Sequence, residues 1–395
     1  MKKRHAIRTI STLFVLTFGS LSFAGTDNIY QWADAVTETE DRGTSVLIIP
    51  MNGQTLTDIR GEVYKELQDD IKQLNPDLIV VEIDCKDAKD IFYQQMGWFN
   101  PKEIGRFEGM TDNLPAVAEV FRMHLKDIEQ VAYVKDSMGA ITPLTLSWER
   151  IYMEPTARLT GTMQLAGRYS EIADENVRGK MRTAWTLLGS ILGGYGNRDE
   201  DLMLALVDPE KLLSGTWNGK KVDWSNDLNG DFTIDPYTNM VPRFSATYAE
   251  ELGISEATVY SLNDVLLLND IREYHIVGEE ITKQLDDYIK NWRTNLQKAK
   301  HLWGDYQQQN GWAAGDQRTR WLSKNKTTIK SLMGICKKYP AVTLRIGFDP
   351  KLKVLENIIE EIEKELRRGG GSQGGGGGSS GPPKMGNVLE EDVTK

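Results

Sequence analysis

Short apolar runs alternate with helical patterns in the first half of the chain. Residues 44–50 (TSVLIIP) are apolar and rich in β-branched side chains, which is typical of a buried strand. Val63, Leu67 and Ile71 then recur at helical spacing, and residues 78–83 (LIVVEI) have the pattern of a second strand. A strand, a helix and a strand within about 40 residues predict a βαβ unit and therefore a parallel sheet.

The same alternation continues further along the chain. A helix with one apolar face is predicted before a strand at residues 131–134, and the residues of that face are Val117, Val120, Phe121, Leu125 and Ile128. His124 lies on or beside this face, where we expect a packing residue rather than a catalyst. After Ser137 the spacing predicts a helix to about Trp148, and residues 150–153 predict a short strand.

Two Asn-Gly pairs, Asn218-Gly219 and Asn229-Gly230, lie between short segments of mixed polarity and predict hairpin turns. Asp223 and its acidic neighbours resemble the ligands of a calcium loop. No register, however, places glycine at the sixth position with oxygen ligands before it. The four histidines of the chain also lack metal-ligand spacing. We therefore expect plain turns here and no structural metal.

Long helical patterns dominate from about residue 279. A seam of apolar residues recurs at spacings of four and three, and its members are Ile281, Leu285, Tyr288, Trp292, Leu296, Ala299 and Trp303. Further helices are predicted at 327–336 and 351–368, so residues 279–368 form an α-helical appendage. Its seam packs on the chain itself or against another subunit, and we prefer intramolecular packing. The glycine-rich residues 369–395 predict a disordered tail.

Composition and charge narrow the class of protein. Of the 395 residues, 40% are hydrophobic and 26% are charged, as in soluble globular proteins with an ample core. The formal net charge is -10, which argues against a nucleic-acid-binding surface. Cys85 and Cys336 are the only two cysteines. They could pair in an exported protein or stay unpaired, and the sequence leaves both possibilities open.

The first residues have the pattern of a secretory signal. A basic start that includes Lys3 and Arg4 precedes an apolar run at residues 10–18, and small residues follow at Ser22 and Ala24. The run is shorter than the ~20 residues that a membrane span needs, which disfavours an uncleaved anchor. We therefore expect a signal peptide at residues 1–24, a linker at 25–43, and an exported chain, periplasmic or extracellular, without a transmembrane helix after cleavage.

Ser137 is the candidate nucleophile, because it lies between a strand pattern and a helix pattern. The carboxyl ends of parallel strands open on helix N-termini, where the dipole and free N–H groups favour the negative charge formed in acyl transfer. Gly139 allows close approach of the backbone. A serine at a helix start can equally be a capping residue. Position alone therefore does not decide between catalysis and capping.

A resemblance to known proteins favours catalysis. Residues 137–140 (SMGA), the apolar segment after them, and 151–155 (IYMEP) resemble the nucleophile region of the Clp protease proteolytic subunit and its relatives, signal peptide peptidase A and the NfeD-type membrane serine proteases. Residues 244–254 and 261–265 are similar to the segment that closes the domain in the latter two branches. The resemblance spans about residues 44–270. It implies an α/β fold with a ClpP/crotonase-like parallel sheet and flanking helices, which we place at residues 44–272.

The resemblance also suggests a general base. The Clp subunit has a histidine shortly after the proline of this segment, and Thr162 occupies that position here, so that triad is absent. The peptidase A and NfeD branches use a lysine in the following helix. Lys180 precedes the turn 196–198 at comparable spacing. A lysine is a base only when burial lowers its pKa towards neutrality. A Ser–Lys dyad therefore predicts a buried Lys180 beside Ser137, and the alternative is a solvated helix residue.

The resemblance implies an oxyanion hole with one departure from the family. The backbone N–H of Met138 would be one donor, beside Gly139. A Pro-Gly-Gly type loop completes the hole in the family, but here residues 84–88 read DCKDA, so that Asp87 and Ala88 replace both glycines. Neither residue suits positive φ, and Asp87 adds a carboxylate near the oxyanion. Loss of one donor typically lowers the rate ~10²–10³-fold.

Three functions follow from these residues. The first is an exported serine peptidase-like protein that hydrolyses a peptide or protein substrate with Ser137 and Lys180 and needs no cofactor. We expect it to be homo-oligomeric, and the sequence leaves membrane proximity open. The second is a catalytically inactive scaffold of the same fold that oligomerises and binds a protein partner through its helical arm, which the altered loop favours. An acyl-CoA enzyme is a weaker third, because export removes the protein from CoA pools.

Overall fold

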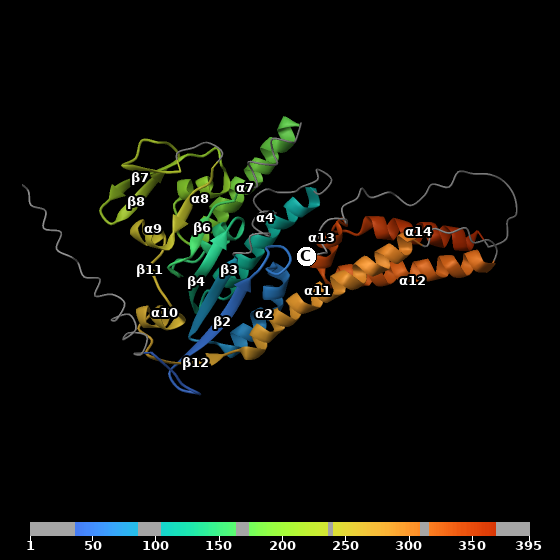
Figure 1. The fold of residues 1–395 in the computed structure, drawn as a ribbon, viewed down its shortest axis with the longest axis horizontal. Coiled ribbons are helices and arrows are strands. Elements are labelled where there is room, and N and C mark those ends of the chain that lie inside the picture. Colours follow the sequence, from blue (N-terminus) through green and yellow to red (C-terminus); the bar gives the residue numbers. More distant parts are fainter. Residues whose placement is uncertain (1–35, 86–103, 163–173, 236–239, 309–315, 369–395) are drawn as a thin grey trace, which may run out of the picture.

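The computed structural model describes residues 36–85, 104–162, 174–235, 240–308 and 316–368. Figure 1 shows a body built on a twisted sheet and an arm of long helices that extends away from it. The predictions for residues 1–24 and 369–395 lie outside the described residues. No helix in the described ranges is both long enough and apolar enough to span a bilayer.

A mainly parallel sheet forms the centre of the body, as the βαβ patterns predicted. Seven strands follow one another across it in the order β1 (Thr37–Glu38), β12 (Glu273–Val277), β2 (Thr44–Asn52), β3 (Leu78–Cys85), β4 (Glu129–Met138), β5 (Ile151–Met153) and β11 (Ala257–Thr258). All of these neighbours pair in parallel. β6 (Arg158–Thr160) continues beside β4 and pairs antiparallel with β10 (Arg243–Ser245). The sheet therefore extends beyond residues 44–272 at both ends, into the predicted linker and into β12.

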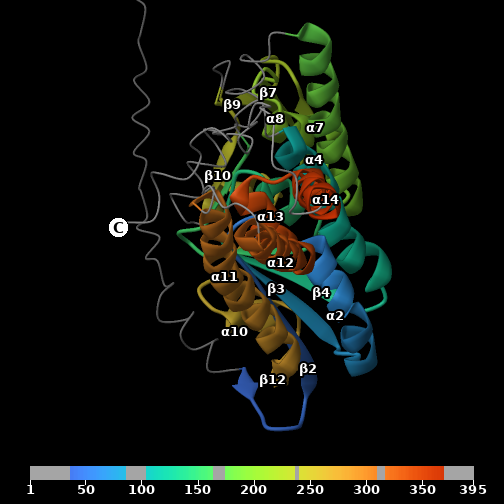
Figure 2. The ribbon, with the colours of Figure 1, turned by 90° about the vertical axis from the view of Figure 1, so that its right-hand side faces the viewer.

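Both faces of the central strands are buried. Ile79, Val81 and Ile83 of β3 face one core, whereas Leu78 and Val80 face the other. The first core is covered by α2 (Gly61–Leu74), α4 (Ile104–Glu119), α7 (Glu175–Tyr195) and α8 (Glu200–Val207). The second core is covered by α10 (Leu262–Leu268). Figure 2 shows α2 and α4 together on one side of the sheet. This two-sided burial explains why the strand sequences are continuous apolar runs.

Two local predictions near Ser137 differ from the structure. β4 continues to Met138, so Ser137 is a strand residue, and the helix after it, α5, spans only Ile141–Thr145. α4 is followed by a π-helical turn, η2 (Val120–His124), in which His124 is exposed and lies 3.6 Å from the Glu119 carboxylate. The expectation that His124 packs in the core is therefore wrong.

A small antiparallel sheet carries the two Asn-Gly pairs. Asn218-Gly219 leads from β7 (Leu213–Asn218) into β8 (Lys221–Ser225), and Gly219 has φ 67°, which confirms the first hairpin. Asn229-Gly230 lies between β8 and β9 (Phe232–Ile234), and these two strands flank β7 on opposite sides. The second pair is therefore in a crossing loop and not in a hairpin.

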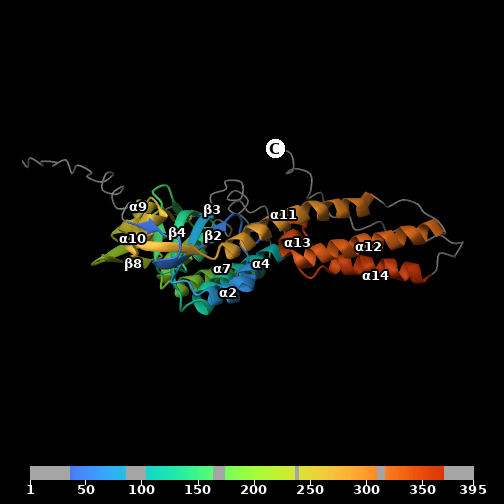
Figure 3. The same cartoon turned by 90° about the horizontal axis from the view of Figure 1, so that it is seen from below.

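The arm is built from α11 (Glu279–Gln308), α12 (Asp316–Lys338), α13 (Pro340–Ile346) and α14 (Lys353–Arg367). Figure 3 shows α11, α12 and α14 running side by side. Ile281 and Leu285 of α11 pack in the body core, while Trp292 and Trp303 pack in a separate arm core. Intramolecular packing of the seam is thus confirmed. Cys85 and Cys336 are both free and buried, one in each core.

Candidate functional site

The register of β3 and β4 brings chemically interesting residues together at the carboxyl edge of the sheet. Asp84 is opposite Asp136, and Cys85 is opposite Ser137, after a register shift between Ile83 and Asp84. Cys85 is buried, its thiol lies 3.5 Å from the carbonyl of residue 51, and burial raises its pKa strongly. The sequence places each strand but not this register, so the neighbourhood of Cys85 and Ser137 could not be predicted.

The Ser137 side chain is fully buried in a pocket of threonines. Its Oγ lies 2.8 Å from Oγ1 of Thr145 and 3.3 Å from Oγ1 of Thr142. Thr145 donates its own proton to the carbonyl of Ile141 at 3.1 Å. Thr142 has two backbone carbonyls within 2.8 Å, those of Ser137 and Thr160. The Ser137 hydroxyl therefore shares its hydrogen bonds with neutral threonine hydroxyls, which are not general bases.

The alternative interpretation of Ser137 as a helix cap is not borne out. The N-cap position of α5 is Ala140, and no side chain caps this helix. The free N–H groups at its start are therefore not matched by the Ser137 oxygen. Within the described residues, the side-chain hydrogen bonds of Ser137 are those to the two threonines, and its backbone N–H also lies 3.1 Å from the Asp136 carboxylate.

Asp136 fixes the backbone next to Ser137. Its buried carboxylate accepts hydrogen bonds from the backbone N–H of Ser137 at 3.1 Å and of Arg158 at 3.2 Å. The Arg158 guanidinium adds an ion pair at 3.1 Å. Sequence reasoning missed this residue, although a carboxylate directly before Ser137 at the end of an apolar strand was a visible signal.

Of the four residues expected to form the oxyanion hole, the structure describes only Met138 and Gly139. Gly139 has φ 77°, and its N–H donates to the carbonyl of Thr160 at 2.9 Å, so this donor is already paired. Met138 lies in the ladder opposite Thr160. Asp87 and Ala88 lie outside the described residues. The loop in which Asp87 and Ala88 replace the two expected glycines therefore lies beyond the part of the site that the structure describes.

Lys180 is exposed on α7. The first turns of this helix project from the body (Figure 1), and its buried residues begin at Trp185. Within the described ranges, no hydrogen bond or ion pair joins Lys180 to Ser137 or to a carboxylate. The structure thus leaves this amine in water, whereas a lysine base requires burial.

The far end of α7 is anchored close to α5. Arg198 donates to the carbonyls of Trp148 at 2.7 Å and Glu149 at 2.9 Å, and burial lowers its pKa to about 10. A Cβ at Gly196 would lie 2.0 Å from the carbonyl oxygen of Leu146, so only glycine fits there. The turn 196–198 therefore fixes α7 near the Ser137 segment at one end only.

Comparisons with known proteins give little further guidance. No family model matches the chain, and no curated protein matches it. Among solved structures, it is similar to a lysine-to-alanine mutant of 1510-N membrane-bound stomatin-specific protease in complex with a substrate peptide. The identity is 12%, the TM-score is 0.35, and the match covers 62% of this chain and 100% of that one. A serine-to-alanine mutant of the same protease matches with 13% identity, a TM-score of 0.34, and coverage of 60% and 99%. Similarity at these TM-scores carries no argument about activity.

The fold and the position of the candidate serine define the structural class of this protein. The described chain is an α/β protein with a large parallel sheet, flanking helices and a C-terminal helical region. Its candidate serine lies at the carboxyl edge of the central sheet.

Proposed function

We propose that this chain is a peptidase-like protein of the ClpP/crotonase type that acts as a polypeptide-binding scaffold. The observation that carries the proposal is the state of the two candidate catalytic groups. Ser137 is fully buried and is hydrogen-bonded to the neutral hydroxyl of Thr145, while Lys180 is exposed. A serine nucleophile needs a base within about 2.6–3.2 Å, and the described arrangement provides none.

The arm supplies the binding surface in this proposal. It has its own core, which includes Trp303 and Leu332, and so it holds its shape away from the sheet. Ion pairs between Arg318 and Glu365 at 2.7 Å and between Lys326 and Glu363 at 2.9 Å also join α12 to α14. A stiff projection of this kind presents helix faces to a protein partner without a large ordering cost.

A second copy of the chain is the proposed partner of α7. Leu187 and Ile191 are 57% and 40% exposed and lie one turn apart on this helix. Lys180 and Thr183 continue the same exposed stripe towards the start of the helix. Contiguous exposed apolar side chains mark association surfaces. An oligomer that covers the stripe would also remove Lys180 from water.

Peptide-bond hydrolysis by a Ser–Lys dyad is the second candidate function. It is favoured by the position of Ser137 at the end of a central strand and by the positive φ of the glycine after Met138. Hydrolysis requires a rearrangement in which the Nζ of Lys180 reaches the Oγ of Ser137. The hydrogen bond between Ser137 and Thr145 would then be replaced by one between Ser137 and Lys180. The substrate would then be a peptide or protein.

A fluorophosphonate probe on the full chain separates the two functions. The scaffold proposal predicts no adduct at Ser137 under conditions that label an active serine hydrolase fully. The peptidase proposal predicts labelling that is lost in Ser137→Ala and strongly reduced in Lys180→Ala. Lys220→Ala, which removes an exposed lysine in the β7–β8 turn, should not change labelling. An adduct at another serine would count against both assignments.

Export is a further part of the proposal. It is supported by the basic start, the apolar run and the small residues of the first 24 positions. The expected mature chain begins at Gly25 and is periplasmic or extracellular. Amino-terminal sequencing of the protein from fractionated cells tests this expectation, and an intact amino terminus in the cytoplasmic fraction would contradict it.

A further inference from the structure

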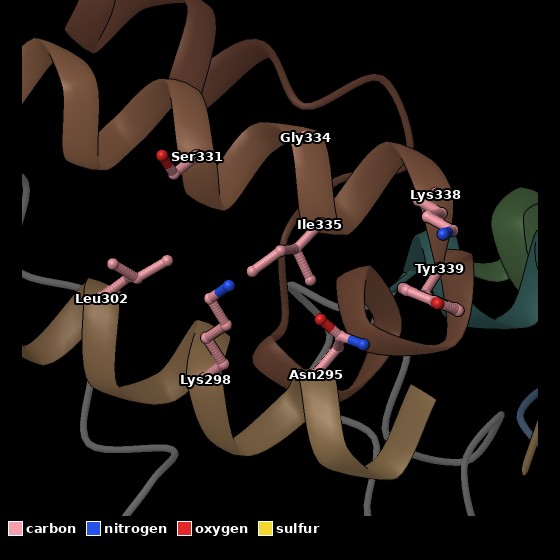
Figure 4. Close-up of a pocket in the computed structure, with 8 residues that line it drawn as sticks. All are labelled: Asn295, Lys298, Leu302, Ser331, Gly334, Ile335, Lys338 and Tyr339. Atoms are coloured by element: carbon pink, nitrogen blue, oxygen red, sulfur yellow. The ribbon is translucent and has the colours of Figure 1, made fainter. Parts of the chain in front are cut away.

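A groove runs along the arm between α11 and α12. It has a volume of about 460 Å³ and is lined by residues that include Lys298 and Leu302 from α11 and Gly334, Ile335, Lys338 and Tyr339 from or next to α12. Figure 4 shows the side chains of Lys298 and Ile335 pointing towards each other across it. The groove is distant from the Ser137 site, because it is built wholly from the arm.

The chemistry of the groove is both apolar and basic. Leu302, Ile335 and Tyr339 are half-buried, whereas Lys298 and Lys338 are exposed. In the described part of the chain neither lysine forms an ion pair with a carboxylate, and the Nζ of Lys338 lies 5.4 Å from the centre of the Tyr339 ring. Such a surface fits a short peptide that presents apolar side chains and carboxylates.

Room for a peptide backbone comes from a glycine. A Cβ built at Gly334 would meet no atom within 4 Å, so the surface of α12 next to Ile335 is not filled by other side chains. Glycine in a helix interior costs about 1 kcal/mol relative to alanine. Because Gly334 lines the groove and carries no side chain, the open space beside it leaves room for a peptide backbone.

The chain itself carries a segment of the required chemistry. Residues 388–393 read VLEEDV, with Leu389 between apolar and acidic neighbours and with Glu390, Glu391 and Asp392 in succession. The three carboxylates complement the ammonium groups of Lys298 and Lys338 in the groove.

The tether between this segment and the arm has a suitable length. α14 ends at Arg367, beside the start of α12, because Glu365 pairs with Arg318. From Arg318 to Ile335 the path along α12 is about 26 Å at 1.5 Å per residue. The 19 residues of 369–387 are mostly Gly and Ser. Gly-rich chains of this length have a root-mean-square span of about 22–26 Å, which maximises the effective concentration of the tethered segment.

We propose that residues 388–393 bind in the groove between α11 and α12 of the same chain. Leu389 lies against Ile335, and the carboxylates of Glu390 and Glu391 lie beside Lys298 and Lys338. Because the ion pairs are at the surface, docking weakens as salt is raised. Occupation of the groove by this segment excludes any other acidic peptide from it.

Photocrosslinking of the full chain tests the proposal. With p-benzoylphenylalanine at position 389, irradiation is expected to give crosslinks that map to the groove residues of α11 and α12. Lys298→Glu with Lys338→Glu should lower their yield about three- to tenfold, as expected for two exposed ion pairs. Lys300→Glu with Lys337→Glu changes the same charge on the same helices outside the groove, and should leave the yield unchanged.

Two further variants keep the test decisive. Gly334→Phe fills the groove without altering charge and should abolish the groove crosslinks. Glu390→Lys with Glu391→Lys should restore them in the Lys298→Glu, Lys338→Glu chain. Circular dichroism checks that each variant is folded. Crosslinks spread evenly over the chain, or an equal loss in the control variant, would overturn the proposal. Crosslinks between isotopically heavy and light chains would assign the groove to a second copy and overturn the intramolecular assignment.

Discussion

The indole N–H of Trp292 donates a hydrogen bond to Oδ1 of Asp58 at 3.1 Å. Trp292 is on α11, where the helix leaves the body, and Asp58 is in the loop between β2 and α2. The Arg293 guanidinium lies 3.1 Å from both oxygens of the same carboxylate, and the backbone N–H of Gln54 lies 3.0 Å from one of them. This buried carboxylate joins the arm to the sheet.

Asp58→Ala should therefore destabilise the protein. The substitution leaves the buried N–H of Trp292 without an acceptor, and a buried donor left unpaired costs about 1–3 kcal/mol. Urea unfolding followed by tryptophan fluorescence measures the change in free energy. Asp69→Ala, on the exposed side of α2, is the matched control and should stay within about 0.5 kcal/mol of the natural chain. Equal effects of the two substitutions would show that the Asp58 contact does not stabilise the joint.

Gly139→Ala should destabilise the segment after Ser137. Gly139 is buried with φ 77°, and a residue with a Cβ pays roughly 1–2 kcal/mol in the left-handed region. The change in unfolding free energy is the measurement. Gly179→Ala is the control, because a Cβ there meets no atom within 4 Å in a helix and should be neutral or stabilising. A neutral Gly139→Ala would mean that this corner relaxes without strain.

The Cys336 thiol should make stability fall at alkaline pH. Burial raises its pKa from 9.0 to about 11, so the unfolded chain loses this proton at a lower pH than the folded chain. The contribution to folding is complete below pH 9 and is lost as pH rises to about 11. The expected loss is about 2 kcal/mol. Unfolding curves of the natural chain and of Cys336→Ala across this range isolate the contribution, and parallel pH dependences would exclude it.

Leu187→Lys with Ile191→Lys should reduce self-association. Both side chains are exposed on α7, so the free energy of unfolding of the single chain should change by less than about 0.5 kcal/mol. Sedimentation velocity compares the oligomer distributions. Leu228→Lys changes an apolar side chain of similar exposure on the β8–β9 loop and should have no effect. A natural chain that stays monomeric at all concentrations would contradict the proposed contact.

Local periodicity predicted the elements that have strong patterns. Residues 44–50 and 78–83 are strands because both faces are buried, and the seam from Ile281 to Trp303 forms one helix because its apolar stripe is continuous. α13 was not predicted, since seven residues are too few to show a helical period. The end of β4 was placed too early, because polar residues 135–137 interrupt an apolar run whose backbone still pairs with β3 and β6.

The site was less predictable than the fold. The sequence identified Ser137 and its strand, but the threonines that bind its hydroxyl become neighbours only through the short turn of α5. The contact of Trp292 with Asp58 joins residues 234 positions apart, and no local pattern indicates such a pair. The proposed dyad depends on the same kind of long-range placement, and for this reason the exposure of Lys180 could not be read from its apolar neighbours.

The length of α11 sets the distance between the sheet and the far end of the arm. The helix contains 30 residues without a break, so it is about 45 Å long. Its first turns are held to the sheet, where the Thr282 hydroxyl donates to the carbonyl of Ile48 at 3.2 Å. The far end of α11 is therefore held at a set separation from the sheet edge. The number of residues in this single helix sets how far the arm extends from the sheet.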